Sequence, residues 1–87
     1  MARWRLVLAR VLSGSADRGV RFADLRGLLL ALGFEERVRS SHHIYTRSSV
    51  VEILNLQPCD GGMAKPYQVR QVRDLIVKYR LTREIQE

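Results

Sequence analysis

Apolar residues recur at helical spacing in two N-terminal segments. In residues 3–12 they fall on one face, and in residues 22–32 leucines stand at positions i, i+3, i+4 and i+7. Both stripes predict short amphipathic helices. The stripes are Trp4, Val7, Leu8 and Val11, then Leu25, Leu28, Leu29 and Leu32. Gly14 and Gly33 follow the two segments, where glycine typically ends a helix in the left-handed conformation. Gly27 lies inside the second segment and is compatible with close packing of another element.

The hydrophobic pattern then changes to that of strands. Residues 34–39 alternate imperfectly, whereas residues 42–47 and 50–56 are rich in β-branched and aromatic side chains, which strands prefer. The serine pairs at 40–41 and 48–49 suit hairpin turns. We therefore predict an antiparallel three-stranded meander. Neither face of the second strand is cleanly apolar, so the buried face stays open at this point.

A last helix is predicted from Pro66, because proline suits the first helical position. Its apolar stripe is Val69, Val72, Ile76 and Tyr79. The element order α-α-β-β-β-α predicts an α+β fold with the sheet packed against helices. We expect one domain over residues 1–87, with an N-terminal helix at about 3–12 and a core at about 21–81. A helix, three strands and a helix is the arrangement of double-stranded-RNA-binding domains, which recognise RNA shape and backbone.

The charge balance points to a polyanionic partner. Fifteen Lys and Arg stand against nine Asp and Glu, giving +6 at pH 7, and only Lys65 and Lys78 are lysine. Arginine forks onto phosphate through two hydrogen bonds. This composition favours nucleic acid or an acidic protein as partner, over a basic surface that only keeps the chain in solution.

Cysteine content and apolar run length restrict the remaining classes. The single cysteine, Cys59, allows neither an internal disulfide nor a cysteine-rich zinc site, which fits a reducing compartment. The apolar runs are too short to span a membrane. We expect a cytoplasmic protein without metal, cofactor or membrane contact.

The adjacent histidines His42 and His43 are the candidate chemical groups. The chain has no nucleophile elbow, phosphate-binding loop or dinucleotide fingerprint. An imidazole near RNA can remove the proton of a 2′-hydroxyl, which then attacks the adjacent phosphorus while a cation stabilises the developing charge. Adjacent histidines at a strand start are more often packing or surface residues, so the chemistry alone does not decide between these roles.

Three sequence blocks in a fixed order resemble the HicA toxin family of bacterial toxin–antitoxin systems. They are SSHHIY at 40–45, ILNLQP at 53–58 and AKPYQV at 64–69. Shorter blocks at 12–15, 21–25 and 32–34 match longer members of that family, so the likeness covers about residues 6 to 81. The resemblance implies a double-stranded-RNA-binding-like fold, ribosome-independent cleavage of mRNA, and a HicB-type antitoxin protein that binds and masks the toxin.

The family's Gly-Ser-His motif aligns its catalytic histidine with His42 and its serine with Ser41, leaving His43 as the variable residue that follows. Ser40 departs from the motif, where glycine is usual. Glycine there permits positive φ or close approach of the RNA backbone, and serine in a left-handed conformation costs roughly 1 kcal/mol or more. A tolerated variant, a weakened enzyme and an attenuated form all stay open.

Three basic residues at and after the predicted helix start are candidates for RNA phosphates. They are Lys65, Arg70 and Arg73. The alternative is that they are solvated or paired with acids such as Asp74 and Glu36. Two rival functions also remain: a non-catalytic double-stranded-RNA-binding module, and a DNA-binding regulator that reads with its first helices.

Overall fold

The computed structural model describes residues 2–84. Its helices are α1 (Arg3–Ser13), α2 (Phe22–Ala31) and α3 (Pro66–Tyr79), and its strands are β1 (Glu35–Arg39), β2 (His42–Arg47) and β3 (Val50–Leu56). Short 3₁₀ turns η1, η2 and η3 span Asp17–Gly19, Asp60–Gly62 and Leu81–Glu84. The predicted order α-α-β-β-β-α and the α+β class are confirmed.

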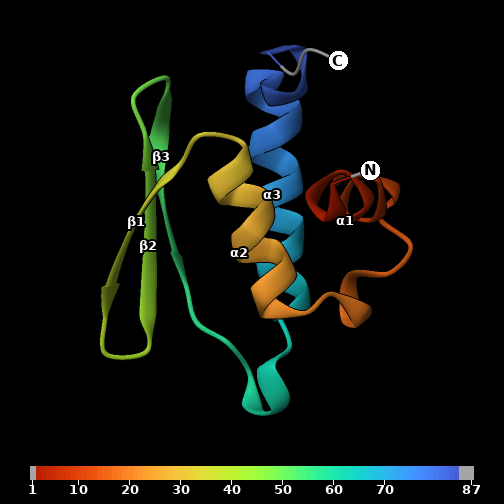
Figure 1. The fold of residues 1–87 in the computed structure, drawn as a ribbon, viewed down its shortest axis with the longest axis vertical. Helices are drawn as coiled ribbons and strands as arrows, with labels where there is room; N and C mark the ends of the chain where they lie inside the picture. Colours follow the sequence, from red (N-terminus) through yellow and green to blue (C-terminus); the bar gives the residue numbers. More distant parts are fainter. Residues whose placement is uncertain (1, 85–87) are drawn as a thin grey trace.

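The elements are arranged in layers, with the sheet on one side, α2 and α3 next to it, and α1 on the far side of those helices (Figure 1). The antiparallel sheet has the strand order β1-β2-β3. The core fills the spaces between the sheet and the helices α2 and α3 and between those helices and α1, because each helix turns its predicted apolar stripe inward. Its fully buried side chains include Tyr45, Leu54 and Leu56 from the sheet and Val11, Leu25, Leu28, Val69 and Val72 from the helices.

The helix ends follow the predicted chemistry. Gly14 has a φ of 71° and Gly33 a φ of 90°, the left-handed region that glycine enters without a Cβ penalty. The surroundings of Gly27 differ from the expectation. Nothing outside its own helix lies within 4 Å of the point where a Cβ would stand, so the interpretation of close packing at this glycine is wrong.

The structure also decides which face of β2 is buried. His43 and Tyr45 point toward the helices, while His42 and Thr46 are exposed on the outer face of the sheet. The inner face can bury the polar hydroxyl of Tyr45 because this hydroxyl donates a hydrogen bond to the Glu36 carboxylate at 2.7 Å. The β2–β3 register shifts between Tyr45 and Arg47.

Candidate functional site

The turn between β1 and β2 sets the position of the candidate site. Arg39 pairs with His42, so Ser40 and Ser41 are the two residues of a tight hairpin turn. Only Ser40 has positive φ, at 53°, which is the pattern of a turn that favours glycine at its first central position. Ser41 Oγ accepts a hydrogen bond from Gln57 Nε2 at 2.9 Å. The turn is therefore tied to the segment that follows β3.

His42 stands at the start of the middle strand with its imidazole exposed. Its Nδ1 lies 3.0 Å from Asn55 Oδ1, on β3. When Nδ1 carries the proton and donates to this oxygen, the lone pair of Nε2 is left to accept a proton. Arg39 stands directly opposite His42 on β1. The outer face thus places a cation on one side of the imidazole and an orienting amide on the other.

His43 lies on the other face of the strand, in a packed position. Its ring is 20% exposed, meets Phe22 edge-on with centroids 4.8 Å apart, and stacks on Tyr45 at 6.5 Å. Nδ1 is 3.2 Å from Glu36 Oε2. The adjacent histidines therefore divide between the two roles considered for them: His43 packs against the helical layer, and His42 faces solvent.

Glu36 connects β1 to α2 and β2. Arg26 donates two hydrogen bonds to its carboxylate, at 2.7 and 2.9 Å, and these bonds, with those of Tyr45 and His43, outweigh burial and lower the pKa of Glu36 to about 2. Burial, and then the hydrogen bond to Glu36, raise the pKa of the Tyr45 phenol. The cluster holds β2 against α2 and so fixes which face carries His42.

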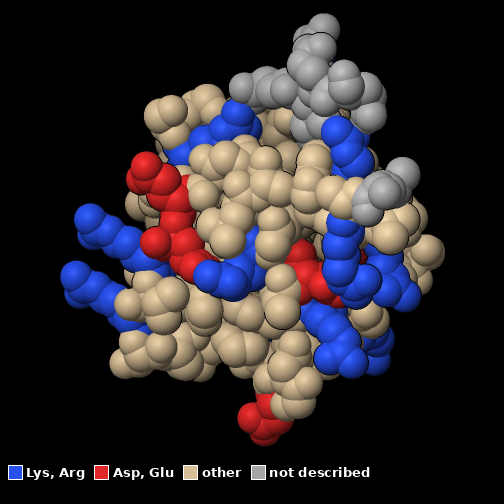
Figure 2. All heavy atoms as spheres, in the orientation of Figure 1, with Lys and Arg blue, Asp and Glu red and all other residues tan. Residues whose placement is uncertain are grey.

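A shallow hollow of about 390 Å³ lies on the outer face of the sheet. Its lining residues are Glu35, Arg37, Arg39, Ile44, Thr46 and Ile53. Arg37 stands opposite Ile44 on this face. Among the side chains of residues 2–82, Arg37 and Arg39 form no ion pair, whereas Arg3, Arg26, Arg73 and Lys78 each pair with a carboxylate. Figure 2 shows basic side chains that extend outward into solvent on the side of the molecule that carries the sheet.

Lys65 and Arg70 are available to a ligand. The start of α3 and the β1–β2 turn lie at the same end of the molecule along its long axis (Figure 1). The backbone N–H of Lys65 donates to Gln68 Oε1 at 3.3 Å, and neither Lys65 nor Arg70 has an ion-pair partner within the described part of the chain.

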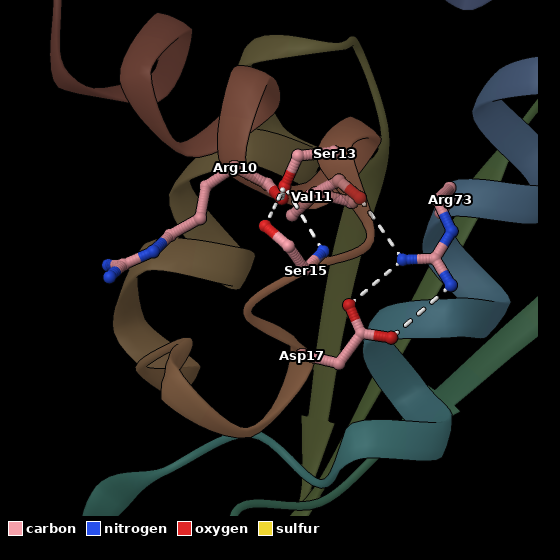
Figure 3. A network of polar contacts seen from close by, with 6 residues as sticks. All are labelled: Arg10, Val11, Ser13, Ser15, Asp17 and Arg73. Carbon is pink, nitrogen blue, oxygen red and sulfur yellow. Dashed lines mark hydrogen bonds and ion pairs between the residues drawn. The ribbon is translucent and has the colours of Figure 1, made fainter.

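Arg73 has a structural contact instead. Its guanidinium donates to the Asp17 carboxylate at 2.9 and 3.2 Å and to the Val11 carbonyl at 3.1 Å. Figure 3 shows these bonds joining α3 to the end of α1 and to the η1 turn. At the end of α1, the Ser13 hydroxyl donates to the Arg10 carbonyl at 2.7 Å. The alternative of pairing with an acid thus applies to Arg73, although the acid is Asp17 rather than Asp74 or Glu36.

Asn55, Arg37 and Arg39 are site residues that the sequence reasoning missed. Asn55 had a weak signal, since it lies within the ILNLQP block, but its approach to His42 depends on strand register. The two arginines had a signal in their alternation along β1, which places both on one face.

No family model, curated protein or solved structure matches the chain. Where side chains are described, in residues 2–82, no three His, Cys, Asp or Glu gather in a way that would hold a metal ion. No helix in that range has the length and hydrophobicity needed to cross a membrane.

Proposed function

We propose that this protein is an endoribonuclease of the HicA toxin type that cleaves mRNA with His42 as general base. The observation that carries the proposal is the setting of His42: an exposed imidazole, held through Nδ1 by Asn55 at 3.0 Å, with Arg39 across from it on β1.

The reaction follows from these positions. His42 Nε2 takes the proton of an RNA 2′-hydroxyl, and the 2′-oxygen forms a bond to the adjacent phosphorus. The bond from phosphorus to the 5′-oxygen breaks, and that oxygen takes a proton from solvent. Arg39 offsets the negative charge that builds on the phosphoryl oxygens. The products are a 2′,3′-cyclic phosphate and a 5′-hydroxyl end, and this route uses neither a metal nor a covalent enzyme intermediate.

The wider context supports the same proposal. The α-α-β-β-β-α order suits a double-stranded-RNA-binding-like fold, and the net charge of +6 suits both an mRNA substrate and the acidic surface of a HicB-type antitoxin, with electrostatic steering of association. Ser40 has a φ of 53°, a left-handed conformation in which glycine, the usual residue of the resembling family, carries no Cβ penalty.

The test compares wild type with His42→Ala on labelled single-stranded RNA in EDTA. A general base contributes about 10²- to 10⁴-fold, so His42→Ala should lose at least about 100-fold in cleavage rate. His43→Gln is the matched control, assayed at a temperature where the variant is folded, and should keep cleavage within a few-fold. Equal cleavage by wild type and His42→Ala would refute the proposal.

Asn55 provides a second, independent readout. Asn55→Asp places a carboxylate beside Nδ1, which favours the protonated imidazole. The ascending limb of the pH–rate profile should therefore move to higher pH. An unmoved profile would exclude His42 as the titrating base.

A non-catalytic double-stranded-RNA-binding module is the second candidate, favoured by the half-buried Lys65 and the exposed Arg70 at the start of α3. Retention of duplex RNA by the wild type without any cleavage of single strands would support it over the enzyme.

A further inference from the structure

We propose that β1 forms a track for the backbone of single-stranded RNA, with successive phosphates on Arg39 and Arg37. The inference rests on the proposed function for its direction, because the phosphate on Arg39 is the one beside His42. It adds a binding subsite at Arg37 for a phosphate that is not cleaved.

The spacing of the two arginines matches that of successive phosphates. Residues two apart on a strand point to the same face and stand about 6.7 Å apart, which is comparable to the separation of neighbouring phosphates in an extended nucleic-acid strand. Arg39 is opposite His42 and Arg37 is opposite Ile44. A strand laid along β1 therefore meets His42 at one phosphate and Arg37 at the next.

The two arginines also provide positive charge that no described carboxylate neutralises. Arg37 and Arg39 have no acidic partner among the side chains of residues 2–82. Glu36, the residue before Arg37, points to the inner face and pairs with Arg26. Two unpaired guanidiniums on one exposed face attract a polyanion and can each fork onto a phosphate. Glu35 lines the same hollow beyond Arg37, which would end the track there by repulsion.

The floor of the hollow distinguishes single-stranded from duplex RNA. Ile44 and the exposed Ile53 line it, and an apolar floor contacts a base only when that base is unpaired and turned outward. These side chains offer no hydrogen bonds, so the subsite selects for a single strand and not for a particular base.

The cleavage test uses two substrates, each with one ribose. One is a dinucleotide, whose only phosphate is the scissile one, and the other is a tetranucleotide with the ribose before its central phosphate and deoxyribose elsewhere. Arg39→Ala should slow the cleavage of both by a similar factor. Arg37→Ala should slow tetranucleotide cleavage by roughly tenfold more than dinucleotide cleavage, mainly through KM, because one charge-assisted contact is lost.

Binding gives a readout that does not depend on catalysis. With an all-deoxy strand, the slope of log K against log salt falls by about 0.7 for each phosphate contact removed. Arg37→Ala and Arg39→Ala should each lower the slope by that amount. Arg10→Ala, an exposed arginine on α1 on the far side of the molecule from the sheet, removes the same charge and should leave the slope as it is.

The outcomes separate the two proposals. If the wild type cleaves RNA but Arg37→Ala has equal effects on both substrates and leaves the slope unchanged, the track is refuted and the enzyme stands. If the wild type cleaves neither substrate while both slopes fall, the endoribonuclease is refuted and the track stands as a binding site.

Discussion

Replacing Glu36 by Gln tests whether the polar cluster behind β2 holds the sheet to α2. The Glu36 side chain is 11% exposed and accepts hydrogen bonds from Arg26, Tyr45 and His43. Its Oε2 takes three of these bonds. An amide of the same shape keeps an acceptor at that position but turns its NH₂ group toward the Arg26 guanidinium, where donor faces donor.

The size of the loss follows from the exposure of each partner. Arg26 is 47% exposed, so its ion pair contributes at most about 1 kcal/mol. The Tyr45 side chain is fully buried, and a hydrogen bond to a charged group contributes about 1.5–3 kcal/mol. Because the amide still accepts from Tyr45 but without the charge, we expect Glu36→Gln to lower the free energy of unfolding by about 2–3 kcal/mol. The melting temperature should fall by about 10–20 °C.

The pH dependence of stability distinguishes the charge of Glu36 from its shape. The pKa of Glu36 is lowered from 4.5 to about 2, so its charge stabilises the fold fully above pH 4.5 and the effect is lost as pH falls toward 2. In urea denaturation followed by circular dichroism, the gap between wild type and Glu36→Gln should be constant from pH 7 to 5 and narrow toward pH 2. Glu52→Gln, at a solvent-exposed pair with Lys78, is the control and should lose less. A loss below about 1 kcal/mol at pH 7, or a gap that does not narrow, would contradict the role given to Glu36.

Three further changes test the local structure by the same unfolding measurement. Gly27→Ala should raise stability by up to about 1 kcal/mol, because the site is an open helix interior; a decrease would mean an unseen contact. Arg73→Lys should lose about 1–2 kcal/mol, since lysine ends in a single nitrogen and cannot replace both Nη1, which bonds Asp17 and the Val11 carbonyl, and Nη2, which bonds the second Asp17 oxygen; wild-type stability would show that the fork is not needed. Ser40→Val should lose more than about 1 kcal/mol at a φ of 53°, whereas Ser40→Gly removes the strain of a left-handed serine and should be at least as stable as wild type; equal stability of both variants would argue against the left-handed turn.

The local structure can be read from the amino-acid sequence. The helical stripes, the glycines that end α1 and α2, the two-serine turns and Pro66 at the start of α3 all place their elements within a residue or two of the observed bounds. These signals are readable because hydrophobic period, turn chemistry and capping depend on neighbours along the chain. The composition likewise determined the net charge of +6, although not which faces carry it.

The tertiary structure alone decided the arrangement of the candidate site. Which histidine faces solvent depends on the helices that cover one face of β2, and both faces had mixed polarity in the sequence. Asn55 reaches His42 through the β2–β3 register, and Arg73 finds Asp17 at a separation of 56 residues. Burial and long-range pairing are set by packing between elements, which no local pattern encodes. His42 was thus a candidate from the sequence, and its orienting amide and facing cation came only from the fold.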